Sequence, residues 1–244
     1  MAMRTLLIDI GNTNLKWAWL QDGKMSLLER VGYHTDGVTA QAYRCWSHAE
    51  KPEQVVVANV AGQRVEDELQ QWVTSEWNIG IEVVAASAQQ LGIKNAYACP
   101  EQLGVDRWLA LIAAHENSAV PVCVVDCGTA ITIDALTADG QHQGGLILPG
   151  LDMMRQVMLD RTQISRIGTS ECTELLAGDT AGGIAAGSLH AAAALVERVA
   201  QQMSASPRII LTGSDAPRLK AVMKLEVEID PELVMRGLAL IAQS

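Results

Sequence analysis

The chain has 244 residues, enough for one large or two small domains, and its 49% hydrophobic content is ordinary for a soluble protein. A formal net charge of −10, without a cluster of lysine and arginine, argues against nucleic acid as the main partner. No apolar run reaches the roughly 18 residues of a membrane span, and the first residues lack a signal-peptide pattern, so we expect neither membrane insertion nor export. The five cysteines show no zinc-like spacing, which favours buried free thiols in a cytoplasmic protein.

The first predicted element is a hairpin whose turn is suited to phosphate. An apolar run ends in Asp9-x-Gly11-Asn12-Thr13, and apolar residues resume over 15–20. Small residues in such a turn let backbone N–H groups approach an anion, and a carboxylate beside them can hold a magnesium ion or its water shell. The same turn is also common in ordinary hairpins, and the Asp22-Gly23 pair that follows is a hairpin signal of its own.

The rest of the first half alternates strands and helices. We predict strands over 27–33, 55–60 and 81–84, and helices over 35–48, capped by Asp36, and over 65–73. The tryptophans of this part fall in amphipathic patterns, which favours core positions over ligand stacking for Trp46, Trp72 and Trp77.

An irregular segment then leads into an apolar helix over 108–115. Pro100 and Gly104 interrupt the backbone pattern, so Asp106 and Arg107 fall in the first turn of that helix. An acid there suits the helix dipole, and a solvated arginine beside it is the simplest interpretation. The alternative is a carboxylate at a cleft, available as a general base.

The second half repeats the sequence pattern of the first. Asp126-x-Gly128-Thr129 follows another apolar strand, and Asp139-Gly140 comes thirteen positions after Asp126, as Asp22-Gly23 does after Asp9. This spacing indicates two similar α/β halves with a boundary near 117–121. We predict further strands over 144–150, 208–213 and 227–229, helices over 151–159, 179–203 and 233–242, and a loop over 162–176.

In this order the motifs resemble the type III pantothenate kinases, members of the actin, sugar-kinase and heat-shock-chaperone superfamily. The resemblance covers nearly the whole chain. Its carriers are residues 9–16, Tyr97 with Pro100, 103–108, 126–130, 144–150, Asp179 with Thr180, and 211–213. The family often has a second glycine after Gly213, where this chain has Ser214, so the nucleoside preference stays open.

The resemblance implies a fold and a reaction. The fold is two duplicated ribonuclease-H-like domains, each a mixed five-stranded sheet with flanking helices, with a cleft between them. We expect the halves at residues 1–117 and 118–244, each with one phosphate hairpin, and the second with the helices of a homodimer. The reaction is ATP-dependent phosphorylation of pantothenate to 4′-phosphopantothenate, the first step of coenzyme A synthesis.

The resemblance also implies roles for individual residues. ATP is expected at Asp9, Ile10, Gly11, Asn12, Thr13, Asn14, Leu15 and Lys16 and at Thr129; pantothenate is expected at Tyr97, Gly104, Val105, Asp106, Arg107 and Thr180. Asp106 matches the proton acceptor, and Arg107 beside it suits the carboxylate of pantothenate. Asp126 matches the ligand of a monovalent cation, potassium or ammonium, and Asp9 is expected near the Mg²⁺ of ATP. Whether Lys16 meets a phosphate or faces solvent stays open.

Two other functions remain compatible with such a fold. One is an accessory role in transcription without turnover. The other is a kinase for a different small hydroxylated substrate, or a nucleotide-hydrolysing switch. The presence of Asp9, Asp106 and Asp126 together argues against loss of catalysis, whereas only Tyr97 and residues 104–107 point to pantothenate.

Overall fold

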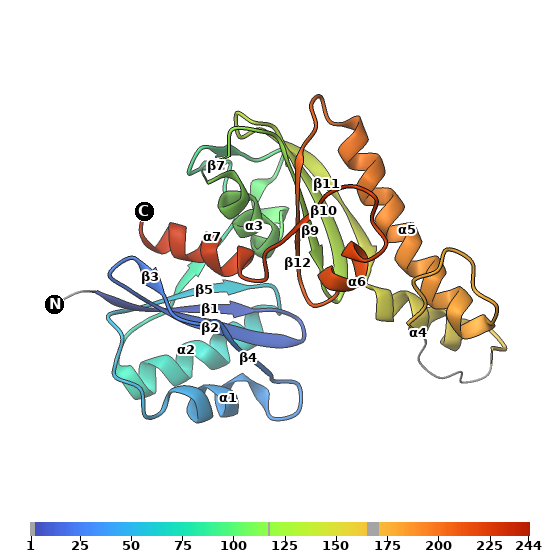
Figure 1. Cartoon of the computed structure of the whole chain (residues 1–244). Coiled ribbons are helices and arrows are strands. Elements are labelled where there is room, and N and C mark those ends of the chain that lie inside the picture. The colour runs from blue at the N-terminus through green and yellow to red at the C-terminus, as the bar shows by residue number, and fades with distance from the viewer. Residues whose placement is uncertain (1–2, 117, 165–170) are drawn as a thin grey trace. The chain divides into compact units, whose positions relative to one another are not determined.

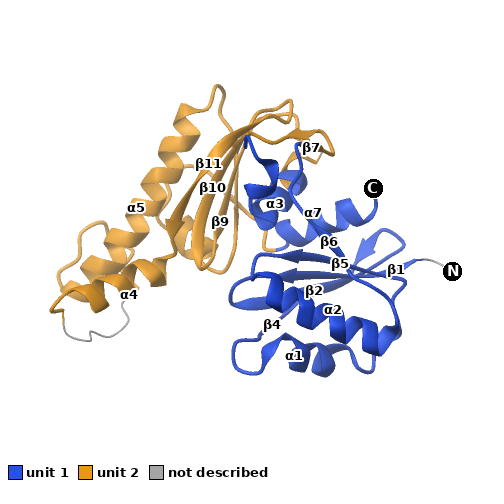
Figure 2. Ribbon diagram, turned by 180° about the vertical axis from the view of Figure 1, so that it is seen from behind, with its two compact units in different colours: residues 1–88, 97–113, 232–244 blue, residues 89–96, 114–231 orange. Residues whose placement is uncertain are grey.

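A computed structural model describes residues 3–116, 118–164 and 171–244, which form two units (Figure 2). Unit 1 consists of residues 1–88, 97–113 and 232–244, and unit 2 of residues 89–96 and 114–231. The units therefore interleave along the chain. The sequence repeat predicts consecutive halves at 1–117 and 118–244, and that division into duplicated domains stays a prediction.

Unit 1 is built on a mixed sheet with the strand order β3-β2-β1-β5-β6 (Figure 1). Strand β1 (Arg4–Ile10) pairs antiparallel with β2 (Asn14–Gln21) and parallel with β5 (Gln54–Asn59), which pairs in turn with β6 (Glu82–Val84). The expected strand over 27–33 is confirmed by β4 (Glu29–Gly32), which is shorter, but the strand β3 (Lys24–Met25) before it was not expected. These two short strands pair with different parts of β2, so this sheet has six strands instead of five.

Helices cover both faces of this sheet. Helices α1 (Gly37–Trp46) and α2 (Gln63–Trp77) lie on one face, and α7 (Leu233–Ala242) lies on the other (Figure 1). The predicted tryptophan core is confirmed, because Trp46 lies 5.8 Å from Trp72, and Trp72 5.0 Å from Trp77, between ring centroids. Leu6, Ile8 and Ile10 of β1 pack into this cluster. Since strand side chains alternate between faces, Asp9 points to the opposite face.

The start of α1 differs from the prediction. Asp36 precedes the helix, but its carboxylate accepts no hydrogen bond from the helix backbone. It binds Arg44 Nη1 at 2.6 Å instead. The carboxylate thus forms an exposed ion pair on the helix surface, and such a pair contributes little to stability.

Unit 2 has a second mixed sheet with the order β11-β10-β9-β12-β13. Its strands are β9 (Val122–Cys127), β10 (Ala130–Leu136), β11 (His142–Pro149), β12 (Arg208–Thr212) and β13 (Glu228–Ile229). As in unit 1, an antiparallel meander is followed by two parallel strands, which agrees with the predicted repeat. Asp9 lies opposite Lys16 and Asp126 opposite Thr132, so the second turn is one residue shorter.

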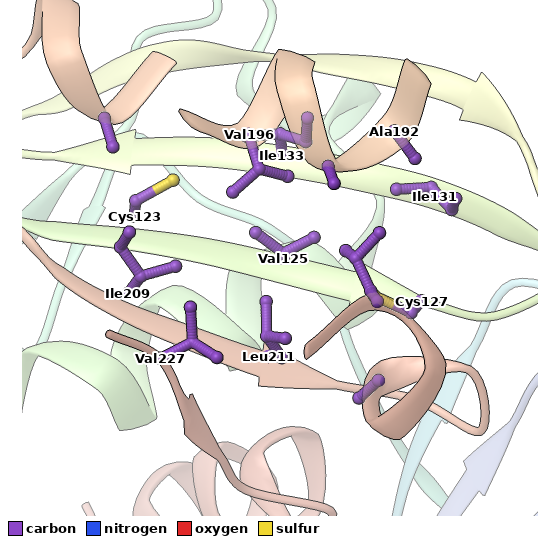
Figure 3. Close-up of a cluster of buried hydrophobic side chains, with 14 of the residues drawn as sticks. Cys123, Val125, Cys127, Ile131, Ile133, Ala192, Val196, Ile209, Leu211 and Val227 are labelled. Carbon is purple, nitrogen blue, oxygen red and sulfur yellow. The ribbon is translucent and has the colours of Figure 1, made fainter. Parts of the chain in front are cut away.

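The core of unit 2 lies between this sheet and three helices, α4 (Leu151–Arg161), α5 (Thr180–Gln202) and α6 (Ala216–Lys220). Figure 3 shows Cys123, Val125 and Cys127 along β9, with Val196 and Ala192 of α5 above the strand. Burial raises the pKa of the Cys123 thiol to about 12, so this thiol is no nucleophile at neutral pH. The expectation of buried thiols is wrong for Cys99, which is exposed because it stands in the irregular segment before Pro100.

The remaining elements join these sheets. Strands β7 (Gln89–Gln90) and β8 (Ile93–Lys94) form a small hairpin in unit 2, and a 3₁₀ turn, η1 (Pro100–Gln102), precedes α3 (Val105–His115). Asn117 and residues 165–170, which belong to the predicted boundary and the predicted 162–176 loop, lie outside the described residues. Within the described ranges, every helix is too short or too polar to cross a bilayer.

Candidate active site

The first predicted phosphate turn follows β1 at the carboxyl end of its parallel pairing with β5, a common ligand position in α/β sheets. The Gly11 N–H donates to the Asn14 carbonyl at 3.0 Å, and Asn12 and Thr13 are exposed. Ile10 and Leu15, which were also expected to bind ATP, are fully buried. Their side chains belong to the core, so only their backbone can serve a ligand.

Asp9 and Lys16 form a pair across the base of this turn. Lys16 Nζ lies 3.4 Å from Asp9 Oδ2, the carboxylate opposite it in the pairing of β1 with β2, and whether it also binds a phosphate stays a prediction. Asp9 is only 5% exposed. Burial raises the pKa of the Asp9 carboxyl, Lys16 opposes that rise, and the nearby charge of Asp106 adds to it. Asp9 and Asp106 are therefore close enough in unit 1 to repel each other.

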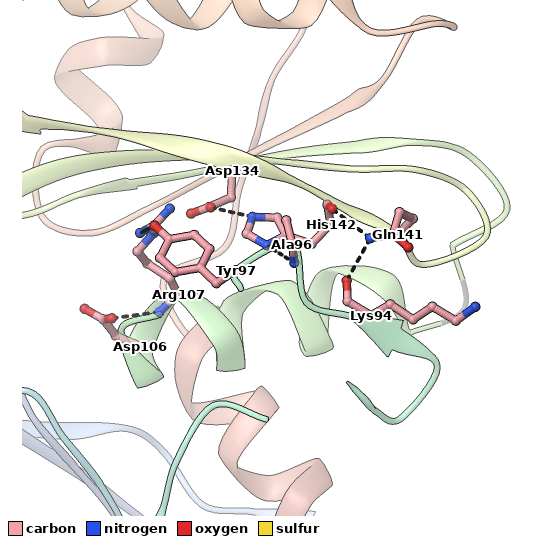
Figure 4. A network of polar contacts seen from close by, with 8 residues as sticks. All are labelled: Lys94, Ala96, Tyr97, Asp106, Arg107, Asp134, Gln141 and His142. Atoms are coloured by element: carbon pink, nitrogen blue, oxygen red, sulfur yellow. Dashed lines mark hydrogen bonds and ion pairs between the residues drawn. The ribbon is translucent and has the colours of Figure 1, made fainter. Parts of the chain in front are cut away.

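The segment predicted to bind pantothenate carries a buried arginine. Arg107 is 6% exposed, its Nη1 donates to the Tyr97 hydroxyl at 2.9 Å, and its guanidinium lies 5.7 Å from the centre of the Tyr97 ring (Figure 4). The interpretation of Arg107 as a solvated side chain is therefore wrong. The hydrogen bond and the ring contact together hold the planar cation in one orientation.

Asp106 is anchored at the beginning of α3. Its Oδ1 accepts the Arg107 N–H at 2.8 Å, and Gly104 leaves room for it, because a Cβ at Gly104 would stand 2.6 Å from the same oxygen. Val105 is buried beside them. Gly104 thus acts through the space that it leaves for the carboxylate.

The second predicted turn, in unit 2, is held by three backbone hydrogen bonds of 3.0 Å. Gly128 donates to Ala130, Gly150 donates to Thr129, and Asp215 donates to Cys127. Thr129 is exposed. Gly213 has a φ of +87° and leaves no room for a side chain, because a Cβ there would stand 2.5 Å from Asp126 Oδ1.

Thr180 is the exposed first residue of α5. Asp179 caps this helix, with its Oδ1 accepting the Gly182 N–H at 2.9 Å. Of the predicted site residues, Asp9 to Lys16, Tyr97 and 104–107 lie in unit 1, whereas Asp126, Thr129 and Thr180 lie in unit 2.

A family model described as type III pantothenate kinase matches residues 5–202, most of the chain. The chain belongs to the type III pantothenate kinase family. Relatives with that name are 41% identical in Nitrosococcus oceani, covering 98% of this chain and 93% of the relative, and 36% identical in Nitrosospira multiformis, covering 98% and 90%. Members of this family phosphorylate pantothenate in coenzyme A biosynthesis.

Solved structures share the fold at low identity. One described as a Baf family transcriptional activator from Campylobacter jejuni has a TM-score of 0.64 and 20% identity, covering 98% of this chain and 97% of that one. One described as a 2-dehydro-3-deoxygalactonokinase from Sinorhizobium meliloti has a TM-score of 0.60 and 14% identity, covering 98% of each. At such identities these likenesses support the actin and sugar-kinase fold and say nothing about activity.

The residues of this type III pantothenate kinase fit a magnesium ion brought by ATP. No group of three His, Cys, Asp or Glu gathers as a closed metal site in the part of the chain that the structure describes. Magnesium in kinases needs only one or two carboxylates besides the phosphates and water. Asp9, at the entrance of the first turn, is the carboxylate that would lie near such an ion.

The kinase also contains a buried polar pair that the sequence analysis did not single out. His142 Nε2 lies 2.9 Å from Asp134 Oδ1, and both residues are 1% exposed. The Ala96 N–H donates to His142 Nδ1 at 3.4 Å, so Nε2 carries the ring hydrogen and donates it to Asp134 (Figure 4). The pair fixes the residue that precedes Tyr97. An isolated histidine in a hairpin gives no signal of such a role.

Proposed function

We propose that this member of the family transfers the γ-phosphoryl group of ATP to the hydroxyl of pantothenate with Asp106 as general base. The observation that carries the proposal is the arrangement of unit 1, where Asp106 is anchored by the Arg107 N–H, its charge acts on buried Asp9, and Arg107 is held by Tyr97. It provides a carboxylate for the proton and a fixed cation for an acidic substrate. Kinases need mainly positioning and charge neutralisation, since the transition state is loose.

In this mechanism each residue has a separate task. The backbone of the turn at residues 11–14, where Asn12 and Thr13 are exposed, and the Lys16 ammonium bind the phosphates, and a bound magnesium ion would neutralise their charge. Asp106 accepts the hydroxyl proton as the bond to phosphorus forms. Arg107 pairs with the pantothenate carboxylate, and Tyr97 holds the guanidinium in orientation. In unit 2, Asp126 binds the monovalent cation and Thr129 binds ATP. Thr180 binds pantothenate.

A coupled kinase assay tests this function. ADP formation from MgATP should require pantothenate and stay at background with other small hydroxylated substrates, such as sugars and glycerol. Turnover of another substrate of the panel at a higher kcat/KM than that of pantothenate would contradict the substrate assignment.

Arg107→Ala should chiefly weaken pantothenate binding. Loss of a charge-assisted pair is worth about 1.5–3 kcal/mol, so the KM for pantothenate should rise by about 10- to 150-fold, with a much smaller change in the KM for ATP. Steady-state kinetics with each substrate varied in turn measures this. Arg64→Ala is the matched control, because Arg64 is exposed and pairs with Glu68 on the surface of α2. An unchanged KM for pantothenate would rule out the carboxylate contact.

We also propose a potassium or ammonium ion at Asp126. The Asp126 carboxylate and the Cys127 carbonyl both approach the Gly213 backbone, so two oxygens suited to a monovalent cation stand close together. Turnover should therefore be low in sodium-only buffer and recover when potassium or ammonium is added. Full activity with sodium as the sole monovalent cation would contradict this role.

A homodimer is proposed as the working form, in the cytoplasm. Several apolar side chains of β11 and α4 in unit 2 are exposed, and they include Ile147 at 66% and Val157 at 52% exposure. Apolar patches on a protein surface commonly mark interfaces between subunits. Sedimentation equilibrium tests this assembly, and a monomer at micromolar concentration would contradict it.

A further inference from the structure

Tyr33 reaches the first phosphate turn from the end of β4. Its hydroxyl donates to the Gly11 carbonyl at 2.7 Å, and both residues belong to unit 1. Strand β4 brings it there, because Gly32 pairs with Asn14 at the exit of the turn. The side chain is 7% exposed and packs in the tryptophan core, and its own carbonyl accepts the Gly37 N–H at 2.8 Å. The tyrosine is therefore fixed independently of the turn.

The bond to the Gly11 carbonyl also determines the direction of a neighbouring N–H. The carbonyl of Gly11 and the N–H of Asn12 belong to one planar peptide unit, in which they point in opposite directions when the bond is trans. None of the described peptide bonds is cis. Because the carbonyl is held toward the buried Tyr33, the Asn12 N–H points away from Tyr33. Asn12 itself is an exposed residue.

The tyrosine is well suited to this task. Burial raises the pKa of the Tyr33 phenol, so the hydroxyl stays protonated and donates at any pH at which the protein works. A donor on the carbonyl also polarises the peptide unit and makes its N–H a stronger donor to an anion. Glycine tolerates more backbone conformations than other residues, so this contact restricts the orientation of the 11–12 peptide.

We propose that Tyr33 is a positioning residue for ATP. Its hydroxyl holds the Gly11–Asn12 peptide in the orientation that presents the Asn12 N–H to a phosphate oxygen. The proposal rests on the proposed function, because it takes the turn at residues 11–14 to be a phosphate site.

The test compares three Tyr→Phe variants, each losing one hydroxyl. Tyr33→Phe should raise the KM for ATP and the Kd for MgATP, measured by calorimetry without pantothenate, by about three- to tenfold, the usual range for one lost hydrogen bond. The KM for pantothenate and the Tm should stay near the wild-type values. Tyr43→Phe is the matched control, because Tyr43 is 61% exposed on α1, and it should change neither constant. Tyr97→Phe should act on the KM for pantothenate instead.

Each outcome decides the matter. MgATP binding by Tyr33→Phe equal to that of Tyr43→Phe overturns the proposal, and so does a Tyr33→Phe protein that fails to fold or weakens both substrates equally, since the hydroxyl would then be structural. If the wild type binds MgATP but does not phosphorylate pantothenate, the proposed function is wrong. The effect of Tyr33→Phe on the Kd for MgATP still tests the positioning role of Tyr33. If a Lys16→Ala variant weakens MgATP binding and Tyr33→Phe does not, the phosphate site stands and Tyr33 has no part in it.

Discussion

Asp106→Asn should lower kcat by a factor of about 10² to 10⁴, the usual contribution of a general base. Asparagine keeps the shape of the side chain, and its Oδ1 can still accept the Arg107 N–H, which Asp106 accepts at 2.8 Å. The KM for ATP should change little, because the phosphate turn is untouched. The fold should also be retained, since the substitution removes the charge that repels buried Asp9.

Glu101→Gln provides the matched control for this variant. Glu101 is an exposed carboxylate in the 3₁₀ turn just before α3, and its neutralisation should leave kcat unchanged. Steady-state kinetics and thermal melts of both variants complete the experiment. If Asp106→Asn retains wild-type kcat, another group accepts the proton and the general-base assignment is wrong.

Gly213→Ala should damage both the stability of unit 2 and its second turn. The backbone at Gly213 has a φ of +87°, which costs a non-glycine residue about 1–2 kcal/mol. The new methyl group would also overlap the Asp126 carboxylate and the Cys127 carbonyl, and relief of such overlap costs about 1–3 kcal/mol more. The expected loss is therefore about 2–5 kcal/mol in the free energy of unfolding.

The same overlap should displace Asp126, so the variant should need more potassium for half-maximal activity. Gly80→Ala is the control, because Gly80 is exposed, has open space at the Cβ position and should tolerate alanine without loss. Chemical denaturation and a potassium titration measure the two effects. A Gly213→Ala protein with wild-type stability would show that the turn is loosely packed.

The sequence was sufficient for those features that depend on local patterns. The repeated Asp-x-Gly turns predicted two hairpins, and both sheets have the same order of an antiparallel meander followed by two parallel strands. The apolar runs located β1, β5 and β9, and the helical spacing located Trp46 and Trp72 in the core. Both signals arise from the periods of strands and helices, which are set within a few residues.

Features that depend on distant pairing were not predicted. The additional strand β3 reflects pairing with the end of β2, and the Lys16 contact reflects its position opposite Asp9. Tyr33 reads from the sequence as one more aromatic residue at the end of a strand. Only the register of β4 against β2 reveals that it ends beside the phosphate turn. Burial of Arg107 likewise follows from tertiary packing and from no local signal.

The position of α7 has a consequence for the order in which the protein can fold during synthesis. Residues 232–244 belong to unit 1, and Gly237 of α7 approaches the Leu109 backbone of α3 so closely that a Cβ would overlap it. The face of the first sheet opposite α1 and α2 therefore stays uncovered while the ribosome makes all of unit 2. Unit 2, whose residues 89–96 and 114–231 come earlier, can complete its core first, and the unit whose strands are made first is finished last.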